Sequence, residues 1–412
     1  MTEQAIFTII LIIILADFIL ERTLSYLNQK SAEKPIPQEL EGIYDKEKYA
    51  KSQAYNREVS RFGSFASTFS FVLLFLAIYF GLFGMLDKWI RTFSPFDMLT
   101  SLIFFGILFV ISDVIGTPFS LYRTFVIEER YGFNKTTPKT YVLDKLKGYL
   151  LTLLIGGLLL IVLLYLLSTL GSDFWIYFWA IVTAFILIMN VFYTSWILPL
   201  FNKLSPLDDG ELKESIRAFS QKVNFPLKNI FVMDGSKRSS RGNAFFSGLG
   251  GRKKVVLFDT LIEKHTTEEL TAVFAHEVGH YKKRHIILTT VISIAQMGLM
   301  LYLLSLMIFN SEVSFAMGGD ITAVHLNILA FGILYTPISH ILGLLMNLLS
   351  RKNEYEADRY AGEKYAGEPL ITALRKMSSD HLTNLTPHPA YVFVHYSHPP
   401  LLQRVRALKQ YT

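Results

Sequence analysis

The most regular feature of the chain is the alternation of long apolar runs with polar segments. Seven runs are long enough, or nearly so, to cross a bilayer as helices, because about 20 apolar residues span its hydrocarbon core. These runs occupy residues 5–20, 62–86, 97–122, 148–170, 174–198, 286–309 and 322–349. Because further spans follow the short first run, we interpret it as a membrane anchor and not as a cleaved signal peptide.

The polar segments divide the predicted protein into membrane and soluble parts. The expected divisions are membrane helices one to five at 1–198 with cytoplasmic loops at 21–61 and 123–147, a first soluble part at 199–285, helices six and seven at 286–349, and a second soluble part at 350–412. We therefore expect a mainly α integral membrane protein with one soluble domain that the last two spans interrupt.

The first soluble part has the pattern of a small α and β unit. A helix is expected at 209–223, and short runs rich in β-branched and aromatic residues predict strands at 230–233, 243–246 and 254–258. Glycines at 248–252 indicate a turn before the last strand. The soluble domain is therefore predicted to contain a small β-sheet.

Basic residues are distributed unevenly between the polar segments. Of 40 Lys and Arg residues, the segments 21–61, 123–147, 199–285 and 350–412 carry 8, 6, 15 and 9, and the segments between them carry almost none. Since basic loops stay on the cytoplasmic side, we expect an outside or lumenal N-terminus and a cytoplasmic soluble domain. The net charge of +6 thus follows membrane topology, and no motif indicates a nucleic-acid partner.

Composition restricts the chemistry. With 51% apolar residues, the chain is typical of a protein whose partner is the lipid bilayer. It has no cysteine, so disulfides, cysteine-ligated zinc and thiol catalysis are excluded. A transition-metal site must use His, Asp or Glu.

The strongest chemical motif precedes the sixth run. His276 and His280 are four residues apart, so on a helix they project from one face and can bind one metal ion. Glu277 completes H-E-x-x-H, in which two histidines bind zinc and the glutamate takes a proton from water. Thr266 and Glu269 form a capping-box pattern that sets the start of this helix. Chance matches and surface His/Glu pairs share this pattern, so the site needs further ligands.

Two acidic residues after the seventh run can complete the site. Glu354 and Asp358 share one face of a helix that is expected to extend the last span, while Glu356 points elsewhere. A catalytic zinc site has three protein ligands and one open position. We therefore predict Glu354 as the third ligand and Asp358 as the carboxylate that orients a ligand histidine. Taken alone the segment is also typical of a solvated charged helix; its pairing with the histidines favours the metal site.

With both motifs present, the chain resembles the type I CAAX prenyl protease family, integral-membrane zinc metalloproteases with H-E-x-x-H followed by E-x-x-x-D after two further membrane helices. The resemblance covers nearly the whole chain, in segments at 44–49, 53–55, 128–134, 200–203 and 398–400. It implies seven membrane helices that enclose a large chamber, capped by a cytoplasmic metalloprotease domain holding one Zn²⁺.

The resemblance also implies a reaction and its substrate. Family members cleave near the C-terminus of prenylated CAAX proteins, which are therefore the expected partners. It implies that His398 donates a hydrogen bond to the oxyanion and that Arg404 contacts the substrate or supports the site. Asn243 and Ala244 would begin an edge strand that pairs with the substrate backbone.

Other polar residues are given structural roles. Those inside the runs are expected to face the chamber or one another, as substrate contacts or as ties between helices: Asp17, Asp113, Asn190, His340 and Asn347. The histidines outside the motifs are expected to be structural or surface residues: His265, His285, His325, His381, His388 and His395.

Two other functions stay open. A quality-control membrane protease, as in the related heat-shock family, would use the same zinc chemistry with fewer spans. A non-catalytic scaffold or transporter with a structural zinc is disfavoured, because a structural site needs four protein ligands and no base. The membrane would be the endoplasmic reticulum in a eukaryote and the inner membrane in a bacterium.

Overall fold

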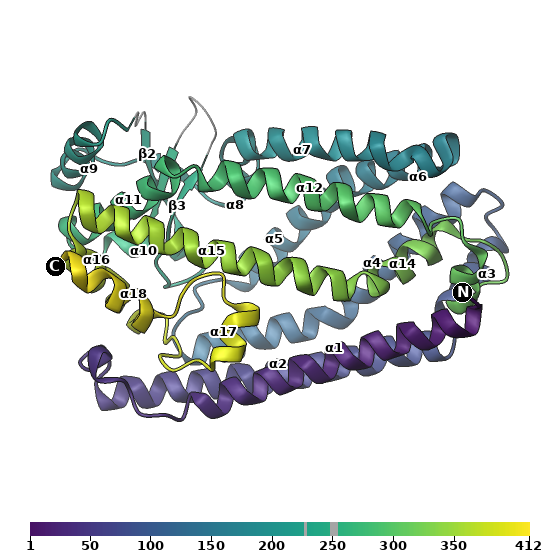
Figure 1. Ribbon diagram of the computed structural model, residues 1–412, viewed down its shortest axis with the longest axis horizontal. Coiled ribbons are helices and arrows are strands. Elements are labelled where there is room, and N and C mark those ends of the chain that lie inside the picture. Colours follow the sequence, from purple (N-terminus) through teal and green to yellow (C-terminus); the bar gives the residue numbers. More distant parts are fainter. Residues whose placement is uncertain (226–228, 248–253) are drawn as a thin grey trace.

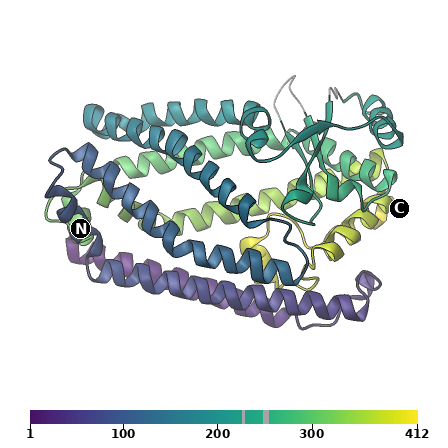
Figure 2. The same cartoon turned by 180° about the vertical axis from the view of Figure 1, so that it is seen from behind.

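The computed structural model describes residues 1–225, 229–247 and 254–412, so the turn predicted at 248–252 lies outside the described residues. Long helices run along one axis, and a small α/β unit sits at the end that carries the C-terminus (Figure 1). The N-terminus lies at the opposite end in both side views (Figures 1 and 2). The mainly α fold with a small sheet is confirmed.

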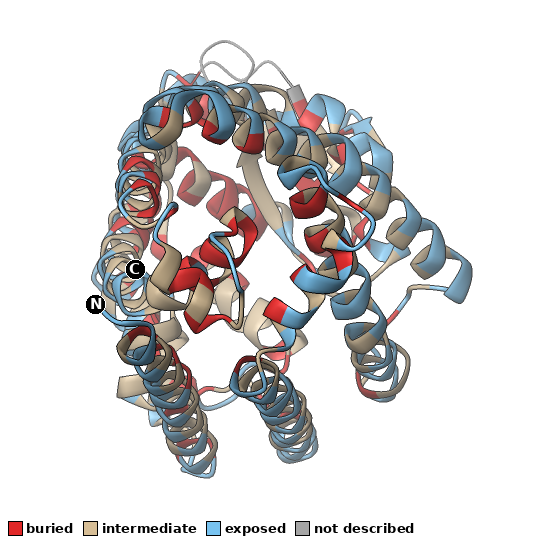
Figure 3. Ribbon diagram, turned by 90° about the vertical axis from the view of Figure 1, so that its right-hand side faces the viewer, coloured by how far each residue is buried: buried red, intermediate tan, exposed pale blue. Residues whose placement is uncertain are grey.

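The long helices are α1 (Glu3–Ser31), α2 (Lys46–Tyr79), α4 (Asp97–Tyr122), α5 (Pro138–Leu151), α6 (Leu158–Leu170), α7 (Phe174–Trp196), α12 (His285–Ser305), α14 (Val324–Leu334) and α15 (Thr336–Lys364). In the described part of the chain, five helical stretches are long and apolar enough to cross a membrane, and the bent pair α14–α15 makes a sixth. Only 6% to 17% of the residues in the apolar windows of these five are buried, and the long helices expose much of their outer surface (Figure 3). Because so large an exposed apolar surface requires contact with lipid, the chain is an integral, multi-pass membrane protein.

The predicted fourth and fifth spans fall in one 64-residue helical stretch, Pro138–Phe201. The stretch is interrupted where α6 ends, at Gly171, whose φ of 56° a residue without a Cβ adopts readily. α6 and α7 then pack together around an apolar cluster that includes Leu167 and Phe174. The total number of crossings depends on whether this stretch counts once or twice.

Two predicted spans differ from the observed helices. The run at 62–86 is broken, because Gly81 has a φ of 63° and separates α2 from a short helix α3 (Leu82–Arg91). The run at 322–349 is bent by 49° between α14 and α15. The bend coincides with Pro337 in the first turn of α15, where the missing N–H does not interrupt a helical hydrogen bond.

The end that carries the N-terminus is closed by tight backbone contacts. Gly84 N in α3 donates to Met317 O at 3.1 Å, just after α13 (Ser311–Ala316). A Cβ on Gly84 would lie 1.9 Å from Gly318 O. This position therefore has no room for a side chain.

The sheet has four strands in the order β1-β2-β4-β3: β1 (Leu204–Pro206), β2 (Asn229–Met233), β3 (Ala244–Ser247) and β4 (Lys254–Phe258). β2 and β4 pair in parallel, and β1 and β3 pair antiparallel to their neighbours. The three predicted strands are confirmed within one residue. β1 has only three residues and contains a proline, which weakens the sequence signal of a strand.

The soluble helices are α8 (Leu198–Phe201), α9 (Glu211–Lys222), α10 (Asp259–Ile262), α11 (Thr267–Lys282), α16 (Gly367–Asp380), α17 (Pro389–His395) and α18 (Leu401–Leu408). They enclose one apolar core in which Ile216, Val255, Phe274, Ala361 and Leu370 are almost fully buried. Residues from both soluble parts and from α15 share this core. The two soluble parts thus fold around one another.

Gly84→Ala is expected to separate α3 from the 311–319 segment and to lower the free energy of unfolding by about 1–3 kcal/mol, the usual cost of overpacking. Thermal unfolding of the detergent-purified chain measures this as a lower Tm. Gly106→Ala in α4 is the control, since its Cβ would meet nothing within 4 Å. Equal Tm shifts for the two variants would contradict the close packing.

Candidate metal and catalytic site

The histidine motif lies on α11, whose start is set by a capping box. Thr266 Oγ1 accepts from Glu269 N at 3.3 Å, and Glu269 Oε2 accepts from Thr266 N at 3.1 Å, as predicted. Such caps stabilise a helix start by roughly 1 kcal/mol. They also settle the helical register, which places His276 and His280 on one face.

The acidic motif lies on α15, which continues the last membrane helix into the soluble domain as predicted. α11 packs against α15, and Gly279 makes the close approach possible. A Cβ on Gly279 would lie 3.0 Å from Ala357 Cα and 3.1 Å from Ala357 O. A larger residue between the two histidines would push the two motifs apart.

The two motifs meet in a compact group of three side chains. His276 Nε2 lies 3.1 Å from His280 Nε2 and 3.5 Å from Glu354 Oε2, and His280 Nε2 lies 3.2 Å from Glu354 Oε1. One candidate ligand atom from each residue lies within 4.8 Å of the others. Tertiary structure therefore brings together the three residues predicted as ligands.

The chemistry of this group fits a metal ion. His276 Nδ1 lies 2.9 Å from Asp358 Oδ1, and this nearby carboxylate favours the tautomer that carries its proton on Nδ1 and a lone pair on Nε2. Glu354 Oε2 is buried and accepts no hydrogen bond from the described residues. Two ring nitrogens and one unsatisfied carboxylate oxygen converging on one point are the donors that zinc takes.

Asp358 is held by Arg404 of α18 through two contacts. Arg404 Nε and Nη2 lie 2.8 and 2.6 Å from Asp358 Oδ2 and Oδ1. Arg404 Nη1 also lies 3.4 Å from Glu354 Oε2, and its side chain is 11% exposed. The guanidinium thus contacts both Glu354 and Asp358, the partner of His276, and the substrate contact predicted for Arg404 stays a prediction.

Glu277 and His398 flank the group. Burial raises the pKa of Glu277, which suits a carboxylate that must accept a proton near neutral pH. His398 Nε2 lies 3.3 Å from Glu354 Oε1, and its Nδ1 lies 2.9 Å from Ser397 Oγ. Although the His398 side chain is 62% exposed, partial desolvation beside the site lowers its pKa, which favours the neutral ring. The structure thus places both predicted catalytic side chains beside the three metal-binding candidates.

The segment that carries His398 is tied to α15. Arg351 Nη1 donates to Tyr396 O at 2.5 Å and to Val392 O at 3.1 Å. Asn347 Nδ2 donates to Val394 O at 2.6 Å. Both donors precede Glu354 on the same helix, so α15 positions the ligand and the C-terminal segment together.

Asn243 and Ala244 lie at the edge of the sheet and not among the three converging residues. Asn243 Oδ1 accepts from Ala244 N at 2.9 Å, and β3 is an edge strand that contacts α11. An edge strand is where another backbone can be added. The placement agrees with the expected edge strand.

His285 and Glu356 lie next to the three converging residues, although neither was predicted to belong to the site. His285 was expected to be structural or on the surface, yet its Nδ1 lies 3.0 Å from His280 Nδ1, and its Nε2 lies 3.2 Å from Glu356 Oε2. Helical periodicity alone does not predict this contact, because on a continuous helix His285 would lie about 140° around from His280. Instead α11 ends at Lys282, and Arg284 turns the chain with a φ of 60°.

The polar residues inside the membrane helices contact one another or backbone atoms. His340 Nε2 lies 2.6 Å from Asp17 Oδ1, joining α15 to α1, and Asn190 bonds Ile186 O within α7. Asp113 on α4 faces α5, where it pairs with Lys145 at 3.0 Å and accepts from Tyr149 at 2.6 Å. The roles predicted as ties between helices are confirmed for the Asp17 and Asp113 pairs.

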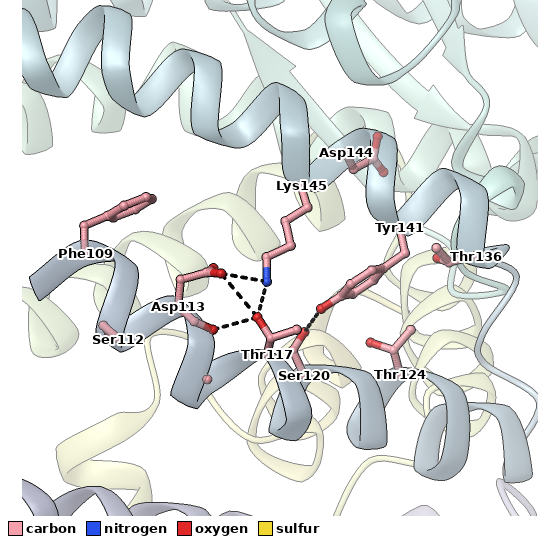
Figure 4. A pocket seen from close by; sticks show the side chains of 11 residues that line it. Phe109, Ser112, Asp113, Thr117, Ser120, Thr124, Thr136, Tyr141, Asp144 and Lys145 are labelled. Carbon is pink, nitrogen blue, oxygen red and sulfur yellow. Dashed lines mark hydrogen bonds and ion pairs between the residues drawn. The ribbon is translucent and has the colours of Figure 1, made fainter. Parts of the chain in front are cut away.

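The Asp113 cluster borders a cavity of about 570 Å³ between α4 and α5. Figure 4 shows Lys145 pointing from α5 toward Asp113 and Thr117 on α4, with Tyr141 above Ser120. This cavity has one acid–base pair and several hydroxyl groups. It lacks the clustered His and carboxylate donors of the α11–α15 site, which is therefore the better candidate for catalysis.

Comparison with known proteins gives matches over the whole chain. The family model "CAAX prenyl protease N-terminal, five membrane helices" matches residues 25–203, and "Peptidase family M48" matches 206–412. The chain is 34% identical to CAAX prenyl protease 1 of Saccharomyces cerevisiae, over 96% of this chain and 93% of that protein. It is 32% identical to the CAAX prenyl protease 1 homolog of Homo sapiens, over 91% of this chain and 88% of that protein.

A solved structure agrees with the sequence matches. The crystal structure of S. mikatae Ste24p superposes with a TM-score of 0.92 at 33% identity, covering 98% of this chain and 99% of that chain. Family M48 implies a metal, typically zinc, which the donor set on α11 and α15 fits. The chain therefore belongs to peptidase family M48, among the CAAX prenyl proteases 1, and is a membrane metallopeptidase.

Proposed function

We propose that this protein is a zinc metalloendopeptidase that cleaves prenylated CAAX proteins near their C-termini. The observation that carries the proposal is the convergence of His276, His280 and Glu354, with Glu277 beside them, at the end of two membrane helices. The relatives are named CAAX prenyl protease 1, and they match 96% and 91% of this chain. A prenyl group is lipid-soluble, so an intramembrane enzyme suits such a substrate.

His276, His280 and Glu354 would hold one zinc ion, and His276 is oriented by Asp358. Zinc in such a site is a Lewis acid that polarises a carbonyl group and acidifies water. Glu277 accepts the proton of the attacking water and passes it to the leaving amine. Its raised pKa makes it a stronger base than an exposed glutamate.

Groups outside the ligand set would bind the peptide. Ser397 Oγ lies 2.9 Å from His398 Nδ1 and can donate to it, which leaves the ring proton on Nε2. Nε2 faces Glu354 Oε1 at 3.3 Å, and once that carboxylate held a metal ion, Nε2–H would donate to the developing oxyanion. The edge strand that begins at Asn243 and Ala244 would pair with the substrate backbone, and such pairing accepts many sequences. Arg404 would act through Asp358 and Glu354, which it contacts.

We further propose seven membrane crossings around a chamber, with the N-terminus outside and the catalytic domain in the cytoplasm. Two crossings in Pro138–Phe201 are supported by the break at Gly171 and by the packing of α6 on α7. The basic segments and the position of the N-terminus at the far end from the catalytic residues support this orientation. In a eukaryotic cell the membrane would be the endoplasmic reticulum.

Membrane-protein quality control is the second candidate function, because it needs the same zinc chemistry but no prenyl group. The match of 96% of this chain to a protein named CAAX prenyl protease 1 favours the first function.

Glu277→Gln should keep one zinc per chain and lose activity on a farnesylated C-a-a-X peptide by about 100- to 10,000-fold, the range typical of a general base. The glutamine has the same shape but cannot accept the proton. Metal analysis and a peptide-cleavage assay on the same preparation measure both quantities. Activity at the parent level would refute the proposed mechanism.

Asp358→Asn should weaken zinc binding by about 10- to 100-fold, since the charge that orients His276 and balances Arg404 is lost. Competition with a chromophoric chelator measures the affinity. Asp208→Asn, on an exposed side chain remote in sequence from both motifs, is the matched control and should bind zinc like the parent. Unchanged binding in Asp358→Asn would show that the carboxylate does not orient the ligand.

Matched peptides with and without the farnesyl group separate the two candidate functions. A CAAX protease should cleave the farnesylated peptide with a kcat/KM at least about 10-fold higher, because the prenyl group contributes transition-state binding. Equal kcat/KM values would favour quality control. Removing zinc with a chelator should abolish cleavage of both peptides, and adding it back should restore cleavage.

A further inference from the structure

His280 also belongs to a chain of polar contacts, through His285 to Glu356, that leads away from the three converging residues. Its outer nitrogen, Nδ1, lies 3.0 Å from His285 Nδ1. The far nitrogen of His285, Nε2, lies 3.2 Å from Glu356 Oε2. His285 is 5% exposed at the first position of α12, and the Glu356 side chain on α15 is 37% exposed.

If Nε2 of His280 binds a metal ion, the ring protons of His280 and His285 can be placed in only one way along these contacts. To present a lone pair from Nε2, His280 must carry its proton on Nδ1, where the nearest acceptor is His285 Nδ1. His285 then carries its own proton on Nε2, which points at the Glu356 carboxylate. Each donor meets one acceptor, and the line ends on a charged group that reaches solvent beside Lys352.

His285 is outside the ligand set itself. Its near nitrogen faces Nδ1 of His280 and not the Nε2 atoms that converge with Glu354. The helix break at Arg284 is what brings it there, since it redirects the chain directly after α11. A positive φ is uncommon for arginine, so this position has a local backbone cost.

The arrangement parallels that of His276. In both His276 and His280, Nδ1 contacts a partner that is, or that in turn contacts, a carboxylate of α15. The carboxylate of Asp358 contacts His276 directly, and that of Glu356, two residues earlier, reaches His280 through His285. One helix therefore supplies a ligand and both orienting carboxylates.

We infer that His285 and Glu356 are positioning residues that hold the ring and tautomer of His280 for zinc. The inference rests on the proposed zinc site and extends it, because it assigns a role to His285, which lies outside both motifs, and to Glu356, which occupies a variable position of E-x-x-x-D. Neither residue touches the substrate or the reacting atoms in this role. Their effect is therefore on metal affinity and ligand geometry.

Zinc affinity of the detergent-purified full-length chain tests the inference. His285→Leu removes the acceptor and should weaken zinc binding by about 10- to 100-fold, measured by competition with a chromophoric chelator. His285→Asn places an amide oxygen near the position of Nδ1 but loses the Nε2 contact to Glu356, so its affinity should lie between those of His285→Leu and the parent. Glu356→Gln should also lie between His285→Leu and the parent, since it weakens only the contact to His285 Nε2.

Glu363→Gln is the control for Glu356, because Glu363 lies on the same helix and pairs with Arg359 at 2.8 Å on its exposed surface. It should leave zinc affinity unchanged. The absorption spectrum of the cobalt(II)-substituted chain gives a second readout. Its d–d bands should shift further from the parent in His285→Leu than in His285→Asn.

The outcomes separate the inference from the function on which it rests. A parent chain that binds no zinc overturns both. A parent that binds zinc, with His285→Leu at the same affinity, overturns only the inference, as does an equal loss in His285→Leu and His285→Asn. If the leucine variant does not fold, Glu356→Gln decides, and parent-like affinity there overturns the inference.

Discussion

The contact between α11 and α15 is the constraint on which the site depends. Two candidate ligands come from one helix and the third from the other, so the separation of the helices sets every distance in the group. Gly279 allows the backbones to approach, with Ala357 directly opposite. Small residues at a helix crossing permit this proximity, and added methylenes cost about 1–3 kcal/mol. The geometry of the candidate metal site therefore depends on the close packing of Gly279 against Ala357, neither of which is a candidate ligand.

The buried charges around the site specify geometry more than they stabilise the fold. The Asp358–Arg404 pair is almost fully enclosed, and moving both charges out of water offsets much of their attraction. Stability comes instead from the apolar core, where Phe274 and Leu370 belong to opposite soluble parts of the chain. Because that core uses both parts, the two membrane helices between them have to return the chain to the same place.

The membrane helices meet this requirement through contacts of different kinds. α12 leaves directly from the metal-binding helix through the left-handed turn at Arg284, and α15 arrives after the bend at Pro337. Just after this bend, His340 of α15 contacts Asp17 and so connects α15 to the N-terminal helix α1. A polar side chain inside the membrane is costly unless it has a partner, so such contacts restrict which faces of the helices can meet.

The sequence by itself determined the helical membrane character, the histidine pair proposed to bind the metal, the capping box and the acidic residues on the last helix that pair with it. These features depend on local periodicity, in which residues four apart share a helix face. It also indicated three of the four strands. Only tertiary structure decided the bent seventh run and the break after Tyr79, because both depend on single glycine or proline dihedral angles. It alone brought His285 to His280, since that contact crosses a helix break where periodicity no longer holds. It also decided that Arg404 reaches Asp358, because a contact between residues 46 positions apart is set by packing and not by local pattern.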